Sequence, residues 1–262
     1  MHYYVYDTFL NDKKYERTLD KIKTRLLDLD IQGRHEKLTL LKSLDELIID
    51  EVKRGTSTVI VVGNDRIFQK VIDVVTRSNV ILGIIPVGPD NNIAESFGIT
   101  DVESACDIIA ARQIIDFDLA QVNNIYCFSD VKLTKSLSRL SIVKDSYTII
   151  PKPECVEVSV SNFYFPRGEI DFNKKMKRYN AHDQRLELII KKEKRKKGWF
   201  NRKQEKSLVD TIVQGDQFEI KSFEYLPVII DDYKVVKTPL KISVAKEKVK
   251  IIVGKNRLIN IK

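Results

Sequence analysis

Apolar residues in the first 120 positions of the chain fall into two kinds of pattern. The run 2–6 is aromatic and β-branched, and the runs 58–62 and 80–87 are almost wholly apolar, as is typical of strands buried on both faces. Apolar residues recur at helical spacing in the segments 13–29, 41–52, 67–75, 93–97 and 102–111. Because strands alternate with helices, this half of the chain predicts a parallel sheet covered by helices.

The pattern changes from residue 122 onward. Short β-rich runs follow one another, and several of them alternate apolar and polar residues, as antiparallel strands do when one face meets solvent. These runs are 156–160, 186–190, 218–220, 240–244 and 249–253. We therefore expect an α/β fold over residues 1–121, followed over residues 122–262 by a β-rich domain resembling an antiparallel sandwich.

Composition agrees with a folded, reduced, non-membrane chain. The 262 residues are 43% hydrophobic and 31% charged, which excludes a disordered or collagen-like protein and suits two domains. The three cysteines are widely spaced with no C-x-x-C pair, so a zinc knuckle or a redox dithiol is not expected. No apolar run has the ~20 residues of a spanning helix, and no signal peptide is recognisable. We expect a cytoplasmic protein.

The formal net charge of +8 is concentrated in one segment. Residues Lys191–Lys206 hold nine Lys or Arg against two Glu, so the rest of the chain is close to neutral, a distribution that disfavours a nucleic-acid coat. Trp199 and Phe200 lie within this segment, and cations beside aromatic residues suit an anionic membrane surface at the inner face of a bilayer. The alternative is a solvated hairpin loop of no special function.

Two strand-to-helix loops carry the chemical information. The first follows the run 58–62 with Gly63, Asn64, Asp65 and Arg66, and the second follows the run 80–87 with Gly88 to Asn91. Ligands of open α/β sheets bind beyond the carboxyl ends of strands, where helix N-termini offer N–H groups to an anion. The alternative is an ordinary connection in which Asn and Asp cap helices or form turns.

The combined pattern resembles the catalytic domain of diacylglycerol kinases and related bacterial lipid kinases, a family that shares its nucleotide-binding fold with NAD kinases. The family's first loop, Gly-Gly-Asp-Gly-Thr, aligns with residues 63–67, and its second, Gly-Thr-Gly-Asn-Asp, aligns with residues 88–92. The flanking residues 82–86 and 94–99 also match. The resemblance implies an ATP site lined by Gly63, Asn64, Asp65, Arg66, Gly88 and Asn91.

The second half of the chain supports the resemblance. Residues 180–188 resemble an Asn-Pro-x-Asp-Gly-x-Leu-Glu-Leu segment of the family, and residues 230–244 resemble its Asp-Gly-Glu segment and the strand that follows. The resemblance implies that Asp231 is the base that takes the proton of a lipid hydroxyl. It also implies that Asp183 and Glu187 help to hold Mg²⁺. The alternative for all three is an ordinary acid at a strand end.

Several departures from the family pattern weaken phosphate binding. Ile67 lacks the hydroxyl of the family's threonine, and Pro89 has no N–H to donate. Arg66 could contact a phosphate or fill the nucleotide site with its bulk. In the acceptor region Gln184 replaces a glycine, and Asp232 and Tyr233 replace a glycine and a glutamate.

Three functional hypotheses remain. The first is a lipid kinase-like protein that transfers a phosphoryl group from ATP to a lipid hydroxyl, with its activity put in doubt by the altered loops. The second, of another class, is a non-catalytic pseudokinase that binds a membrane or a protein partner, with a homodimer left open. An NAD-kinase-like enzyme is third, because the second loop resembles the lipid-kinase form.

Overall fold

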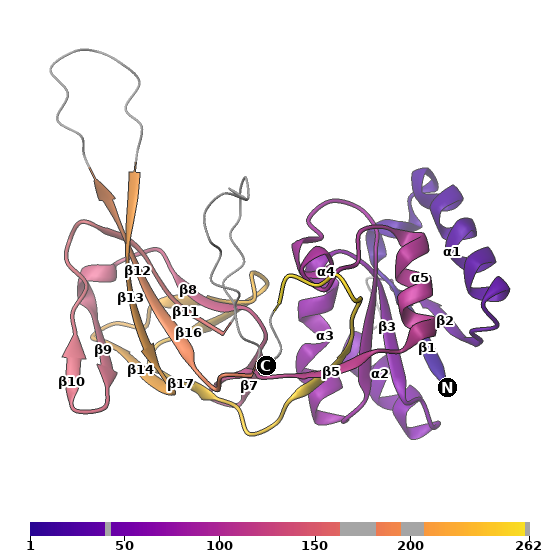
Figure 1. Ribbon diagram of the computed structural model, residues 1–262. Coiled ribbons are helices and arrows are strands. Elements are labelled where there is room, and N and C mark those ends of the chain that lie inside the picture. The colour runs from indigo at the N-terminus through magenta and orange to yellow at the C-terminus, as the bar shows by residue number, and fades with distance from the viewer. Residues whose placement is uncertain (40–42, 163–181, 195–206, 260–262) are drawn as a thin grey trace, which may run out of the picture. The chain divides into compact units, whose positions relative to one another are not determined.

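The computed structural model describes residues 1–39, 43–162, 182–194 and 207–259, and these form two compact units (Figure 1). Unit 1 contains residues 1–118 and takes residues 182–183 and 246–259 from later in the chain. Unit 2 contains the described residues between 119 and 245, apart from residues 182 and 183.

Unit 1 is built on a mostly parallel sheet with the strand order β2-β1-β3-β4-β18-β5, in which only β5 runs antiparallel to its neighbour. Helices α1 and α5 pack together, and α3 contacts α2 and α4 (Figure 1). The α-helices are α1 (Glu16–Asp28), α2 (Leu44–Lys53), α3 (Asp65–Arg77), α4 (Asn92–Ser96) and α5 (Val102–Ala111). The strands are β1 (His2–Tyr6), β2 (Gly33–Lys37), β3 (Thr58–Gly63), β4 (Ile81–Pro86), β5 (Ile114–Phe117) and β18 (Val249–Ile252).

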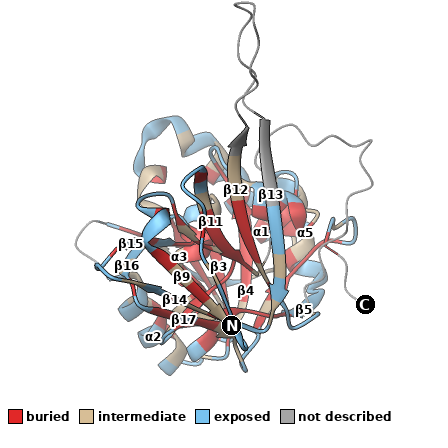
Figure 2. Ribbon diagram, turned by 90° about the vertical axis from the view of Figure 1, so that its left-hand side faces the viewer, coloured by how far each residue is buried: buried red, intermediate tan, exposed pale blue. Residues whose placement is uncertain are grey.

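Burial explains why these residues form strands at the centre of the sheet. Every residue of β3 is buried, and so is every residue of β4 after Ile81, so both strands have apolar contacts on both faces (Figure 2). The short 3-10 helices Thr8–Asn11 and Lys13–Tyr15 connect β1 to α1. The predicted parallel α/β architecture is confirmed.

The last strand departs from the expected division of the chain. The run 249–253 was expected in the β-rich domain, but β18 pairs in parallel with β4 and antiparallel with β5 in unit 1. Val249, Ile251 and Ile252 are all at most 1% exposed. A strand that is apolar on both faces is stable only within a sheet whose two faces are both covered, and the sheet of unit 1 is of this kind.

Unit 2 is a sandwich of two antiparallel sheets, as expected for the β-rich part. One sheet has the order β10-β9-β14-β17-β6-β7 and the other β13-β12-β11-β8-β15-β16. A 3-10 helix, Leu137–Arg139, connects β8 to β9. The strands are β6 (Ala120–Val122), β7 (Ile125–Cys127), β8 (Asp130–Leu133), β9 (Leu140–Lys144), β10 (Tyr147–Ile149), β11 (Cys155–Ser161), β12 (Leu186–Lys194), β13 (Ser207–Gly215), β14 (Gln217–Ser222), β15 (Pro227–Ile230), β16 (Lys234–Lys237) and β17 (Leu240–Val244).

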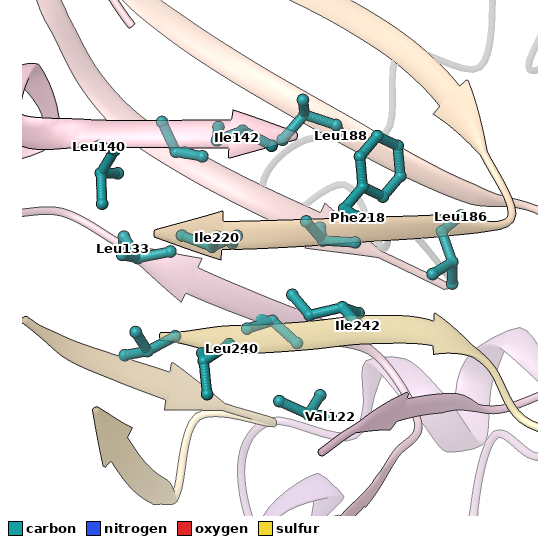
Figure 3. Close-up of a cluster of buried hydrophobic side chains, with 14 of the residues drawn as sticks. Val122, Leu133, Leu140, Ile142, Leu186, Leu188, Phe218, Ile220, Leu240 and Ile242 are labelled. Carbon is teal, nitrogen blue, oxygen red and sulfur yellow. The ribbon is translucent and has the colours of Figure 1, made fainter. Parts of the chain in front are cut away.

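The inner faces of the two sheets form one apolar core (Figure 3). Phe218, Ile220 and Ile242 come from the first sheet, and Leu133 and Leu188 come from the second. Alternate residues of each strand point into this core, which accounts for the period of two in the sequence. Among the described residues, no helix is long and apolar enough to cross a membrane.

The position of β18 leads to a first prediction. Replacing the fully buried Ile251 by Ala should destabilise unit 1 by about 2–4 kcal/mol, because it leaves a cavity in the apolar core against the sheet. Hydrogen exchange should show faster opening of β3 and β4. The exposed Val235→Ala in β16 is the control and should change stability by less than about 0.5 kcal/mol. Unchanged protection of β3 and β4 in the Ile251 variant would contradict the assignment.

Candidate functional site

The first loop leads directly from β3 into α3. Gly63 has a φ of +155°, and a Cβ there would lie 2.9 Å from Ile67 Cγ2 and 3.1 Å from Asp7 Cβ. The side chain of Asn64 caps α3 by accepting a hydrogen bond from the Arg66 N–H at 3.2 Å. Asn64 therefore has the capping role that was the alternative to phosphate binding, and Gly63 is required by close packing.

The second loop follows β4 and is covered by an aromatic pair. Gly88 has a φ of +87°, and a Cβ there would lie 3.0 Å from Phe9 Cε2 and 3.1 Å from Phe9 Cζ. The Phe9 ring meets Tyr15 edge-on, with 5.3 Å between ring centroids. The side-chain amide of Asn91 donates to the Gly88 carbonyl at 2.7 Å. The face of Gly88 that lacks a Cβ is thus already in contact with Phe9.

Asp65 connects the two loops. Its backbone N–H donates to the Asp90 carbonyl at 3.0 Å, and its carboxylate accepts from the Ile93 N–H at 3.0 Å and from the Asn92 amide at 3.4 Å. The Val87 N–H also donates to the Gly63 carbonyl at 2.8 Å. Burial raises the pKa of Asp65 to about 6, although these hydrogen bonds act in the opposite direction.

Arg66 does not enter this arrangement. It occupies the first turn of α3 and is exposed, and its guanidinium forms no hydrogen bond or ion pair with the described part of the chain. The two roles considered for Arg66, phosphate contact and filling of the site, therefore stay predictions.

A third strand end at this edge was missed by the sequence analysis. Asp7 follows β1, and its N–H donates to the Val62 carbonyl at 3.0 Å, which places it beside the end of β3. Its carboxylate accepts from the Thr8 N–H at 2.6 Å and the Thr8 hydroxyl at 3.1 Å. The sequence did contain a signal for Asp7, because it directly follows the predicted strand 2–6 of the same parallel sheet. The carboxyl ends of parallel strands lie at one edge of the sheet, where ligands bind.

Asp231 lies in unit 2 and is 1% exposed. Its Oδ2 accepts from the Phe128 N–H at 2.8 Å, and its Oδ1 accepts from the N–H groups of Ser129 at 2.7 Å and Asp130 at 3.3 Å. The Cys127 thiol is 3.4 Å from the same Oδ1. Burial raises the pKa of Asp231 to about 6 and the pKa of Cys127 well above its usual value. The carboxylate therefore holds the turn between β7 and β8.

The described surroundings of Asp183 and Glu187, the residues proposed for Mg²⁺, contain no carboxylate cluster. Asp183 is exposed, and Glu187 in β12 accepts a hydrogen bond from the side-chain amide of Gln214 at 3.2 Å. Within residues 1–39, 43–162, 182–194 and 207–259, no group of three or more His, Cys, Asp or Glu side chains could hold a metal ion. The donors present do not fit a metal held by the protein alone.

The basic segment begins in β12, the first strand of the antiparallel pair β12 and β13. Lys191 lies in β12 and forms an ion pair with Glu157 of β11 at 2.8 Å, and β12 pairs with β13. Residues 195–206, which carry most of the cations of the predicted membrane segment, lie outside the described residues.

The fold combines a mostly parallel α/β unit with an antiparallel β-sandwich, and the two loops follow neighbouring strands of the parallel sheet. Residues 6–122 match the family model of the diacylglycerol kinase catalytic domain, which confirms the predicted resemblance to that family.

Solved structures extend the fold likeness to nearly the whole chain. A crystal structure described as a diacylglycerol kinase from Bacillus anthracis str. Sterne superposes with a TM-score of 0.73 at 17% identity, covering 97% of both chains. A second structure from the same strain gives 0.74 at 15% identity, again over 97% of both chains. At these identities the likeness concerns the fold. No curated protein matches the sequence.

The burial of Asp65 predicts a pH-dependent stability. Its pKa is raised from 3.8 to about 6, so its contribution to stability is largest below pH 3.8 and is lost as the pH rises through about 6. Asp65→Asn keeps an acceptor for the Ile93 N–H and removes the charge. It should stabilise the fold by about 1–2 kcal/mol at pH 7.5 and by much less at pH 4. Urea unfolding at both pH values measures this, and equal effects would contradict it.

The hydrogen bonds of Asp231 predict that removing its carboxylate destabilises the fold, whereas removing the charge of Asp65 should stabilise it. Asp231→Ala leaves the N–H groups of Phe128, Ser129 and Asp130 without their acceptor, which should cost about 3 kcal/mol. Asp232→Ala, at the exposed neighbouring position, is the control and should cost less than about 1 kcal/mol. Thermal unfolding compares the two variants. A neutral Asp231→Ala would show that the carboxylate does not hold this turn.

Proposed function

We propose that this chain is a pseudokinase of the diacylglycerol kinase family, which binds an anionic membrane and no longer transfers a phosphoryl group. The observation that carries the proposal is the bonding of the two strand-end loops to each other through Asp65. This bonding occupies two backbone N–H groups of the loops, those of Asp65 and Ile93, which could otherwise donate to a phosphate.

The donors at the loops support the proposal. A phosphate site at a sheet edge depends on backbone N–H groups that lack other acceptors. Here the N–H groups of Asp65, Arg66 and Ile93 bond to Asp90, Asn64 and Asp65, respectively. Pro89 has no N–H. Releasing each bonded donor for a phosphate would cost about 1 kcal/mol.

Charge at the same edge supports it further. Asp7, Asp65 and Asp90 bring carboxylates to the loops, whereas the exposed Arg66 forms no ion pair within the described residues. A triphosphate carries several negative charges, and phosphoryl transfer depends on stabilising them. Among the residues that the structure describes, no cluster of side chains could hold a metal ion that would offset these carboxylates. We therefore infer that the residues present do not fit ATP and Mg²⁺, and we derive no step through them.

The surroundings of Asp231 point the same way. A general base has to come within hydrogen-bond distance of the hydroxyl it deprotonates. Asp231 is buried, and three backbone N–H groups already occupy its oxygens. We infer that this aspartate is retained for its structural role in unit 2.

Membrane binding is the part of the family's task that we propose is kept. The segment Lys191–Lys206 carries nine cations and the only tryptophan, and each cation near an anionic bilayer contributes about 1 kcal/mol. The competing function is a divergent, active lipid kinase, favoured by the family match over residues 6–122.

Two measurements on the purified protein test the catalytic part. Labelled ATP and Mg²⁺ are mixed with the protein and with vesicles that contain diacylglycerol, and nucleotide binding is followed by calorimetry. We expect neither labelled lipid nor saturable ATP binding. Labelled lipid that disappears in Asp65→Asn and Asp231→Asn would overturn the proposal in favour of the active kinase.

The membrane part has its own prediction. Replacing residues 194–197 by Gln removes four cations and should weaken binding to vesicles of anionic phospholipid by about 100-fold or more. The matched control replaces the exposed Lys13, Lys21, Lys23 and Lys37 of unit 1 by Gln, with the same loss of charge. Equal binding by the two variants would remove the role of the basic segment.

A further inference from the structure

Strand register brings several connections of unit 2 to one end of its sandwich. Leu133 at the end of β8 pairs with Val158, three residues after the start of β11, and Cys155 at the start of β11 pairs with Lys192 near the end of β12. Leu140 at the start of β9 pairs with Ser222, the last residue of β14. Residues 134–139, 150–154 and 223–226 therefore emerge together, and we call them the aromatic end of unit 2.

The aromatic end exposes large apolar side chains. Phe223 is 98% exposed, Tyr225 is 76% exposed, and Ile150 is 67% exposed. Phe223 and Tyr225 belong to the connection between β14 and β15, and Ile150 directly follows β10. A soluble domain gains nothing by holding aromatic rings in water, so such a group marks a contact surface.

The turn that carries the two aromatic residues is held firmly. The Leu226 N–H donates to the Thr238 hydroxyl at 2.9 Å, and the Thr238 N–H donates to the Leu226 carbonyl at 3.0 Å. The Ser222 hydroxyl donates to the Glu224 carbonyl at 2.5 Å, and Arg139 pairs with the Glu224 carboxylate at 2.6 Å. Phe223 and Tyr225 are thus presented from an ordered backbone and lose little backbone entropy on binding.

Cations surround the aromatic end. Lys135, Lys152 and Lys237 are exposed and form no ion pair within the described parts of the chain. Opposing charge comes from Glu154 and from Glu224, and Arg139 pairs with the latter. β12 runs toward this end and β13 starts from it, so the described strands that flank the proposed membrane segment also meet this end.

We propose that the aromatic end of unit 2 lies against an anionic phospholipid bilayer. Phe223 and Tyr225 insert at the depth of the headgroups, where aromatic rings are favoured, and Lys135, Lys152 and Lys237 face lipid phosphates. The aromatic rings are exposed on the turn 223–226, and Lys135, Lys152 and Lys237 belong to the same end of unit 2, which suits an anionic surface. This inference rests on the proposed membrane function and names the described residues that would perform it.

The test compares sedimentation of the full chain with vesicles of phosphatidylcholine alone and of phosphatidylcholine with phosphatidylglycerol. Phe223→Ala with Tyr225→Ala should weaken binding to the anionic vesicles by about tenfold or more. The apolar controls are Leu27→Ala, 76% exposed on α1, and Val235→Ala, 65% exposed on β16, and both should bind as the unaltered chain does. Replacing the three lysines by Gln should weaken binding mainly at low salt.

A spectroscopic readout reports insertion directly. Trp199 is the only tryptophan, so a chain with Trp199→Phe and Phe223→Trp carries a single probe in the turn. Its emission should shift to shorter wavelength with anionic vesicles.

The outcomes separate the two proposals. If the unaltered chain binds vesicles and the aromatic variant binds equally well with no emission shift, the aromatic end is not the contact surface, while membrane binding stands. If the unaltered chain binds no vesicles, membrane binding fails and this inference fails with it.

Discussion

The hydrogen bonds formed by Asp65 are the interactions on which the candidate site depends. Its carboxylate accepts the Ile93 N–H from the second loop while its own N–H is given to Asp90, so one residue bonds both loops together. Burial raises its pKa to about 6, which means that the fold tolerates a costly charge for the sake of these bonds. Because the N–H groups of Asp65 and Ile93 are taken up in this way, fewer backbone donors remain for a phosphate.

Retained family residues need not signal retained chemistry. Gly63 and Gly88 are the positions of the family pattern that survive best, and glycine in such loops suggests close approach of a phosphate. Here the space beside Gly63 is taken by Ile67 and Asp7, and the space beside Gly88 by Phe9. Both glycines are explained by packing within unit 1.

The sequence predicted the centre of the fold better than its edges. The strands β3 and β4 were recognisable because residues buried on both faces leave an unbroken apolar run. β2, with the sequence from Gly33 to Lys37, was missed because an exposed edge strand carries no such pattern. The placement of β18 could not be predicted. Its apolar run indicates a strand that is buried on both faces, but it does not indicate which sheet of the protein contains that strand.

The site shows the same division. Candidate residues could be chosen from the family pattern, and the capping role of Asn64 followed from ordinary helix chemistry. The enclosure of Asp231 by the N–H groups of residues 128–130 could not be foreseen, because those residues are about one hundred positions away in the chain. Only tertiary structure tells whether a carboxylate near a strand end faces solvent or holds a turn.

Phosphoryl transfer and binding to a membrane make separate physical demands on a lipid kinase. The function that we propose loses the first and keeps the second. Phosphoryl transfer needs donors and charges held to within fractions of an ångström, so a few substitutions in two loops suffice to remove it. Adsorption to a bilayer needs only apolar area and positive charge on one surface, and it tolerates changes in detail. The loops of unit 1 differ at several positions from the family pattern on which phosphoryl transfer depends. The aromatic end of unit 2, where Phe223 and Tyr225 are exposed and three lysines form no ion pair within the described residues, is the surface that we propose meets the second demand. The altered loops belong to unit 1 and the sandwich of unit 2 has its own apolar core, so substitutions in the loops leave that core unchanged.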